Sequence, residues 1–193
     1  MKPPMLSLMV ALSTTYVFAQ AAPTIAAEQP ATPGARKTMY PDLTWPEIVE
    51  HLKTSDVIFV PIGVVEIHGG LPLGIEYYAP LAVAKVMAEK TGGLVFPHIA
   101  NSFAGATKMG EGTINLPIRV GADYTKAIVH ELRRNGFERI VLLTYHGPAP
   151  LTGALVAREV YEETGMPILY IDLAEYRFEG DFWLGALKLL GKL

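Results

Sequence analysis

Four short runs of apolar residues, many of them β-branched, alternate along this chain with segments that carry helical signals. The runs lie at 56–63, 94–99, 139–145 and 167–173. Continuous apolar runs of this length are typical of strands buried on both faces of a parallel sheet, and each parallel connection needs a long crossover. The alternation therefore predicts an α/β fold, in which a mainly parallel sheet of about four strands lies between two layers of helices.

The segments between these runs carry the helical signals. A capping-box pattern, Thr44 followed three residues later by Glu47, predicts a first helix that runs to about Lys53. Further helices are predicted at 78–90, 122–135 and 150–163, with a short helix at 182–190. The stretches 66–76 and 100–118 are interrupted by Gly and Pro and are predicted to be irregular.

The first 38 residues carry signals for export and for a linker. Lys2 precedes an apolar stretch, and the small-x-small pattern Ala19-Gln20-Ala21 follows it. This order predicts a secretory signal peptide at 1–21, the alternative being an apolar helix of the folded domain. Residues 22–38 are rich in Ala, Pro and Thr and predict a flexible linker, which leaves one domain at 39–193. The expected location is the periplasm or the outside of the cell.

Composition excludes several classes of function. The 193 residues include 16 Lys and Arg against 19 Asp and Glu, a formal net charge of −3, so nucleic acid is not an expected partner. There is no run of 18 apolar residues, so no membrane association is expected once the signal peptide is removed. The chain has no Cys, which restricts any metal to ligation by His, Asp, Glu, backbone or water.

Two of the predicted strands end in Gly- and Pro-rich loops that carry histidine. One loop holds Glu66, His68 and Glu76, and the other holds His146. Ligand sites of open α/β sheets lie beyond the carboxyl ends of the strands, and residues two apart in an extended segment point to the same side. The four residues form an oxygen and nitrogen donor set suited to Zn²⁺ or Mn²⁺. The alternative is a surface carboxylate and a histidine that bonds to a loop carbonyl.

These loops carry a resemblance to the creatininase family (creatinine amidohydrolase and its relatives). The stretch 60–76 reads VPIGVVEIHGGLPLGIE, and in the family a strand leads into Gly-x-x-Glu-x-His-Gly-x-His-Leu-Pro-x-Gly-x-Asp. Two later stretches, 110–116 (GEGTINL) and 135–147 (NGFERIVLLTYHG), also resemble the family, so that the match covers 43–172 in order. The resemblance implies an α/β/α fold, a two-metal site, amidohydrolase activity on a small molecule, and a homo-oligomer of the hexamer type.

Carried over residue by residue, the resemblance makes Glu66, His68, Glu76 and His146 the metal ligands. Glu76 stands where the family has a bridging Asp, after a deletion of one residue. The second His of the family motif is absent, and Pro148 replaces an acidic ligand that some members carry. The family's later Gly-Glu-x-Glu-Thr-Ser segment is also missing. Four ligand-type residues survive, so one metal site is expected rather than two.

Four further residues are weaker candidates for parts of this site. His98 follows another predicted strand and is either a replacement for the missing His or a structural histidine. Asp172, Glu175 and Glu179 lie where the missing carboxylate segment would fall, although none of them matches its motif.

The function expected from the resemblance is that of an exported hydrolase that cleaves an amide or cyclic amide C–N bond with metal-activated water. Glu76 would be a ligand or the proton shuttle. The Tyr145 hydroxyl would donate to the oxyanion, unless this side chain only packs. Two alternatives stay open: a non-catalytic descendant that binds a metal or a small ligand, and a single-metal esterase or lactonase.

Overall fold

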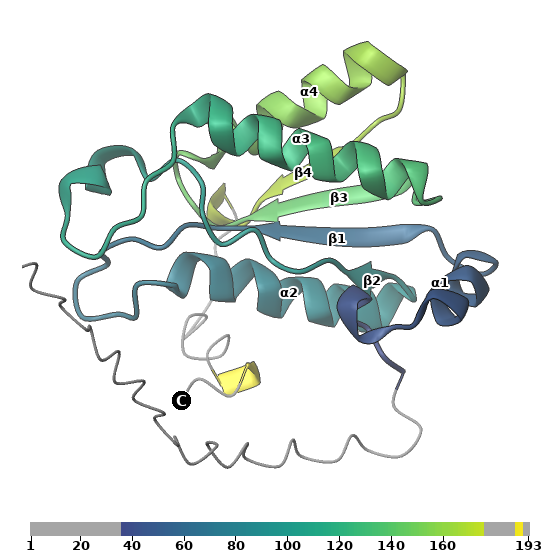
Figure 1. Ribbon diagram of the computed structural model, residues 1–193. Helices are drawn as coiled ribbons and strands as arrows, with labels where there is room; N and C mark the ends of the chain where they lie inside the picture. Colours follow the sequence, from purple (N-terminus) through teal and green to yellow (C-terminus); the bar gives the residue numbers. More distant parts are fainter. Residues whose placement is uncertain (1–35, 176–187, 191–193) are drawn as a thin grey trace, which may run out of the picture. The chain divides into compact units, whose positions relative to one another are not determined.

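The predicted strands form a parallel sheet in the computed structural model, which describes residues 36–175 and 188–190 (Figure 1). The strands are β1 (Val57–Ile62), β2 (Leu94–Val95), β3 (Arg139–Thr144) and β4 (Leu169–Asp172). Their order in the sheet is β2-β1-β3-β4, and each neighbouring pair is parallel. The central strands β1 and β3 pair along their whole length, so that Ile62 and Thr144 end side by side.

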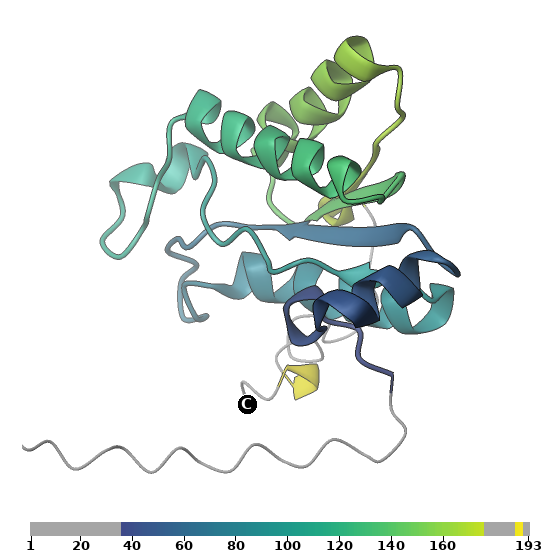
Figure 2. The ribbon, with the colours of Figure 1, turned by 45° about the vertical axis from the view of Figure 1, so that its right-hand side comes forward.

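Helices cover both faces of the sheet. They are α1 (Trp45–Leu52), α2 (Ile75–Thr91), α3 (Ile118–Arg134) and α4 (Gly153–Thr164), with the short 3-10 helices η1 (Tyr40–Asp42), η2 (Gly105–Met109), η3 (Ala149–Leu151) and η4 (Leu173–Glu175). In both views α2 lies on one face of the sheet, and α3 and α4 lie on the other (Figures 1 and 2). The predicted three-layer α/β/α arrangement is confirmed.

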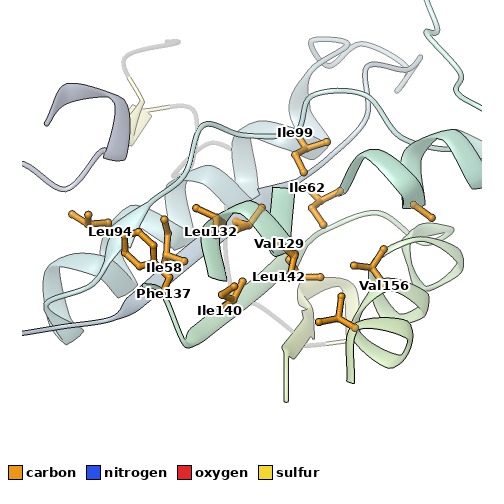
Figure 3. Packing of buried hydrophobic residues seen from close by; sticks show 13 residues of the cluster. Ile58, Ile62, Leu94, Ile99, Val129, Leu132, Phe137, Ile140, Leu142 and Val156 are labelled. Carbon is orange, nitrogen blue, oxygen red and sulfur yellow. The ribbon is translucent and has the colours of Figure 1, made fainter. Parts of the chain in front are cut away.

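The strands are apolar throughout because each face of the sheet packs against helices. In β1, Ile58, Val60 and Ile62 belong to the core beneath α3 and α4 (Figure 3). Phe59, which points the other way, belongs to the core beneath α2 together with Leu143 of β3. All five side chains are buried. Burying one such side chain contributes about 1.5–3 kcal/mol, so these five residues contribute substantially to stability.

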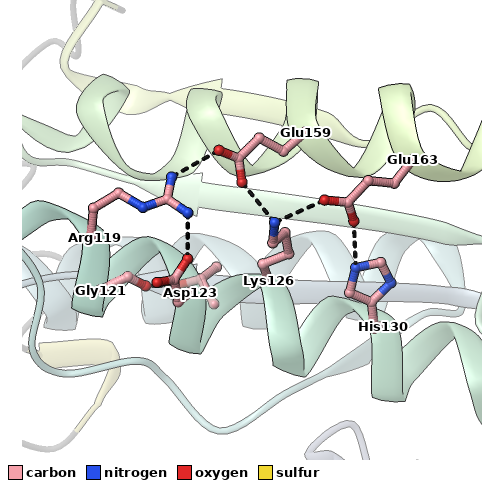
Figure 4. A network of polar contacts seen from close by, with 8 residues as sticks. Arg119, Gly121, Asp123, Lys126, His130, Glu159 and Glu163 are labelled. Atoms are coloured by element: carbon pink, nitrogen blue, oxygen red, sulfur yellow. Dashed lines mark hydrogen bonds and ion pairs between the residues drawn. The ribbon is translucent and has the colours of Figure 1, made fainter.

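An ion-pair network joins α3 to α4 on the outer surface. It comprises Arg119, Asp123, Lys126, His130, Glu159 and Glu163 (Figure 4). Lys126 Nζ lies 2.9 Å from Glu159 Oε2 and 2.8 Å from Glu163 Oε1, so a single ammonium bridges two carboxylates of the neighbouring helix. Partly exposed pairs of this kind contribute little stability each.

Helix α2 begins earlier than the sequence predicts, and this changes where Glu76 lies. The prediction starts the helix at Tyr78, but the observed helix starts at Ile75, directly after Gly74. Glu76 therefore stands in the first helical turn instead of in the preceding loop. A carboxylate is favourable there, because unpaired backbone amides give a helix N-terminus a partial positive charge.

Other boundaries also differ from the prediction for physical reasons. The run 94–99 is regular only over β2, and its pairing with β1 resumes at Ile99, whose amide donates to the Pro61 carbonyl at 2.8 Å. The preceding bond runs from the Phe96 amide to the Phe59 carbonyl, so one extra residue lies between the two bonds and interrupts the ladder. Helix α3 begins at Ile118 instead of residue 122, although this places Gly121 inside the helix. Gly121 is buried beside Thr152, so tertiary packing between α3 and α4 outweighs its weak helical propensity.

Several sequence predictions fall outside the described residues and stay predictions. They are the signal peptide at 1–21, the linker up to residue 35, the carboxylate Glu179 and the helix at 182–190 as far as residue 187. Within the part of the chain that the structure describes, no helix is long and apolar enough to cross a membrane.

Candidate metal centre

Two carboxylates and one imidazole meet at the carboxyl end of the sheet. Glu66 follows β1, Glu76 lies in the first turn of α2, and His146 follows β3. Each offers a ligand atom, and these atoms all lie within 4.8 Å of one another. The three residues are 3%, 7% and 2% exposed, respectively, so they converge inside the protein and not on its surface. We call them the Glu66–Glu76–His146 centre.

The backbone brings these segments together through a return loop. The Glu66 amide donates to the Leu73 carbonyl at 2.9 Å, which lays the start of α2 beside the end of β1. Gly63 allows this close approach, because a Cβ atom built there would lie 2.3 Å from the Cβ of Tyr77. The glycine thus places Tyr77, and with it the adjacent Glu76, against the strand end.

His146 is held through both ring nitrogens. Its Nε2–H donates to the Phe103 carbonyl at 2.9 Å. Its Nδ1 bonds to Glu76 Oε2 and lies 3.3 Å from Glu66 Oε1. The carbonyl can only accept, so Nε2 carries a hydrogen, and Nδ1 is the ring nitrogen that faces the two carboxylates, with a proton in its bond to Glu76.

The centre attracts positive charge. Burial, together with the neighbouring Glu76, raises the pKa of the Glu66 carboxyl. Burial opposes charge on His146, but its bond to Glu76 and the charge of that carboxylate outweigh burial and raise the His146 pKa. Burial would likewise raise the Glu76 pKa, and its hydrogen bonds with His146 and Glu66 outweigh burial and lower it. The carboxyl groups of Glu66 and Glu76 and the imidazole of His146 are thus held together by shared protons.

This donor set fits a divalent metal. A metal ion would take the place of the bridging protons, because metals bind deprotonated carboxylates and a neutral imidazole. Two carboxylate oxygens and one imidazole nitrogen are ligands that Zn²⁺ and Mn²⁺ accept. The Phe103 carbonyl supports the imidazole on its far side, as outer partners of metal-bound histidines commonly do.

His68 lies beside the centre and not within it. Its Nδ1 is 3.8 Å from Glu76 Oε1, and its side chain is 35% exposed. The sequence predicts that Glu66 and His68 converge on one point. In the structure Glu66 lies against the buried His146, whereas the ion-pair partner of His68 is Glu76. His68 could therefore act as a ligand only if its ring moved inward, past its present position beside Glu76.

Two further candidates, Tyr145 and His98, are not among the three residues of the centre. Tyr145 is half-buried and packs against Ala79 and Ala82 of α2. His98 stacks flat on Tyr77, with ring centroids 4.4 Å apart. Neither side chain belongs to the three residues that gather at the centre.

The carboxylates near the end of β4 are not among the three residues of the centre. Asp172 is buried and accepts the Ala174 amide at 2.9 Å, and burial raises its pKa. Glu175 is exposed at the end of η4. Asp172 lies close enough to His146 for their charges to interact, so it contributes to the field around the centre.

Sequence reasoning missed the segment that covers the centre. Thr107, in η2, donates its hydroxyl to Glu66 Oε2, and the Phe103 carbonyl holds His146. Both lie in the stretch 100–118, which the sequence predicts to be irregular. Every residue has a backbone carbonyl, so the residue type at 103 does not indicate the contact with His146. A single threonine in a loop forms no recognisable motif, so no sequence pattern indicated the contact with Glu66 either.

Comparison with known proteins agrees with this geometry. A family model described as creatininase, creatinine amidohydrolase, matches residues 41–188, which is most of the chain. The chain belongs to the creatininase family. The creatinine amidohydrolase of Pseudomonas putida is 30% identical over 148 residues, which cover 72% of this chain and 52% of that protein. The 3-dehydro-scyllo-inosose hydrolase of Thermotoga maritima is 30% identical over 107 residues, 54% of this chain and 34% of that protein.

Solved creatininase structures share the fold. A mutant creatininase of Zn-Zn type superposes with a TM-score of 0.64 at 24% identity, over 73% of this chain and 60% of that one. A creatininase with Mn gives the same TM-score and identity, over 72% and 60%. Zinc and manganese therefore both occur in structures of this fold. This chain spans about half the length, or less, of the two curated relatives named above.

Proposed function

We propose that this creatininase-family chain is a hydrolase that holds one Zn²⁺ or Mn²⁺ at the Glu66–Glu76–His146 centre. Its substrate class is a small molecule with an amide or cyclic amide C–N bond. The observation that carries the proposal is the convergence of three buried acceptor atoms within 4.8 Å. Among the described residues, no lysine or arginine forms an ion pair with either carboxylate, and the partners of both are histidines, which are themselves metal ligands.

Each residue has a distinct task in this proposal. When bound, the metal supplies a water molecule whose pKa is lowered towards 7. Glu66 and His146 are fixed ligands, because Thr107 and the Phe103 carbonyl hold them from outside. Glu76, which lies between His146 and His68, is a ligand or carries the proton from the attacking water to the leaving nitrogen. His68 is the candidate for a fourth ligand.

The curated relatives support hydrolysis of a small molecule but do not define which one. One is named for creatinine and the other for 3-dehydro-scyllo-inosose, and this chain covers only part of each. We choose an amide as the substrate class because the match to the creatinine amidohydrolase covers more of this chain, 72%, than the match to the other relative does.

One observation favours a second function, that of a non-catalytic metal-binding descendant. All three ligand residues are less than 8% exposed, whereas a catalytic metal must leave a position open to its substrate. In this second function the metal stabilises the fold and the protein turns nothing over.

Turnover by the metal-loaded protein separates the two functions. The wild type, loaded with Zn²⁺ or Mn²⁺, is incubated with a panel of small amides, cyclic amides and esters, and products are measured by mass spectrometry. The hydrolase function predicts amide cleavage that falls by about 100-fold or more in Glu76→Gln, since Glu76 is ligand or proton carrier. Full metal loading without any turnover would establish the binding function instead.

Location and assembly complete the proposal. The residue pattern at 1–21 supports export to the periplasm or beyond, with cleavage after Ala21, which N-terminal sequencing of the mature protein checks. The family resemblance supports a homo-oligomer of the hexamer type, which light scattering of the purified protein checks.

A further inference from the structure

The segment that runs from Phe103 to Thr113 touches two of the three proposed ligands. The Phe103 carbonyl accepts the Nε2–H of His146 at 2.9 Å. Four residues later, the Thr107 hydroxyl donates to Glu66 Oε2. This segment lies beyond the sheet and belongs to no strand or long helix, yet it fixes a ligand on each side of the centre.

The two oxygens of Glu66 have different surroundings. Oε2 receives the Thr107 hydroxyl, whereas Oε1 lies 3.3 Å from His146 Nδ1, on the side where the acceptor atoms converge. The Thr107 hydroxyl also lies 3.1 Å from the Ala104 carbonyl, but it has a single hydrogen to donate. A carboxylate is the stronger acceptor, so a Glu66 that is ionised as a metal ligand receives that hydrogen.

Thr107 is preorganised for this contact by bonds at both ends of its segment. On one side, the Ala104 amide donates to Asn115 Oδ1 at 2.9 Å. On the other side, the Ile67 amide donates to the Thr113 hydroxyl at 3.1 Å, which ties the segment to the loop after Glu66. The hydroxyl of Thr107 therefore faces Glu66 from a fixed frame.

We propose that Thr107 is a positioning residue, which occupies Oε2 of Glu66 and so presents Oε1 alone to the metal. The inference rests on the proposed function, because it assigns to Thr107 a role at the proposed metal centre. Without the hydroxyl, the carboxylate of Glu66 is free to rotate or to offer both oxygens, and the preformed geometry is lost. Partners of this kind, which hold a ligand from outside, typically change metal affinity by about 10- to 100-fold.

The test removes the hydroxyl and keeps the shape of the side chain. Thr107→Val is nearly isosteric, Thr107→Ala lacks the hydroxyl in a smaller side chain, and Thr107→Ser restores the hydroxyl. Zn²⁺ affinity is measured on the full chain by competition with a chelator, and the visible absorption of bound Co²⁺ reports the ligand geometry. We expect Thr107→Val and Thr107→Ala to weaken Zn²⁺ binding about 10- to 100-fold and to change the Co²⁺ spectrum, and Thr107→Ser to match the wild type.

The matched control is Thr164→Val, which removes a threonine hydroxyl that donates to the Val160 carbonyl at 2.7 Å, at the end of α4. If the hydroxyl of Thr107 positions Glu66, Thr164→Val keeps Zn²⁺ affinity and the Co²⁺ spectrum close to those of the wild type. Wild-type affinity and spectrum in both Thr107→Val and Thr107→Ala, or an equal loss in Thr164→Val, would overturn the inference. A wild type that takes up no Zn²⁺ would overturn the proposed function as well, so the two failures are distinguishable.

Discussion

At the scale of single residues, the centre depends on a position that has no side chain. Gly63, directly after β1, is buried, and a Cβ built on it would lie 2.3 Å from the Cβ and 2.4 Å from the Cα of Tyr77. The second distance is to backbone, so a rotamer change in Tyr77 cannot relieve the clash. Because Tyr77 follows Glu76, any relief moves the first turn of α2 away from Glu66 and His146.

Gly63→Ala is therefore expected to affect both stability and metal binding. Overpacking of this kind costs about 1–3 kcal/mol of unfolding free energy, and the displaced Glu76 weakens Zn²⁺ affinity. Urea unfolding and a Zn²⁺ titration measure the two effects. The matched control is Gly70→Ala in the same loop, where nothing lies within 4 Å of the added Cβ. Equal behaviour of the two variants would show that Gly63 does not set the approach of α2.

The three residues that meet at the centre could be picked out from the sequence, whereas the contacts that hold them could not. Glu66, Glu76 and His146 were expected as ligands, because carboxylates and histidines after parallel strands are recognisable and match a family motif. His68 was expected among them and lies beside them, because a spacing of two residues fixes direction only while the chain stays extended. Thr107 could not be predicted, since its role depends on where an irregular segment folds back.

At the scale of elements, the start of α1 contains the clearest local charge effect. Glu47 accepts the Thr44 amide at 2.7 Å and the Lys37 ammonium at 2.9 Å. The hydrogen bond from Lys37, followed by the bonds from the Thr44 backbone and side chain, lowers the pKa of Glu47 to about 2. The ionised carboxylate is thus favoured in the folded state relative to the unfolded chain.

The lowered pKa of Glu47 predicts the direction in which stability changes in acid. A carboxyl whose pKa falls on folding stabilises the protein above its unfolded pKa of 4.5, and the effect is lost as the pH falls to about 2. Glu47→Gln keeps an acceptor for Thr44 but loses the charge. The difference in unfolding free energy between wild type and Glu47→Gln should therefore be largest above pH 4.5, and it should shrink towards zero as the pH falls to about 2. A difference that stays constant across this range would contradict the assignment, and Lys37→Met should reduce the same pH dependence.

Element types were predictable from the sequence, whereas several boundaries were not. The four strands and four long helices follow from apolar runs and capping signals, which are local properties. The starts of α2 and α3 were misjudged because Gly74 and Gly121 suggest breaks in a helix. In the fold, Gly74 is the N-cap of α2, and Gly121 lies where α3 and α4 pack, so tertiary contacts decide both positions.

At the scale of the whole molecule, parallel strand order explains why distant residues share one site. The centre joins residues that are up to 80 positions apart, because β1 and β3 are neighbours and end at the same edge of the sheet. The loop before α2 and the segment with Thr107 then close over that edge. The chain spans only part of its curated relatives, and the described residues bring three residues of metal-ligating type within reach of one point.

The most direct test of this account is the metal content per chain, measured by elemental mass spectrometry on protein purified without chelator. The account predicts about one equivalent of Zn or Mn in the wild type and its loss in His146→Ala, which removes the imidazole ligand. His98→Ala is the matched control and should keep the metal, because His98 stacks on Tyr77 outside the centre. A wild type that binds no Zn or Mn even when either is added, or a His146→Ala variant that keeps its full equivalent, would contradict the central claim.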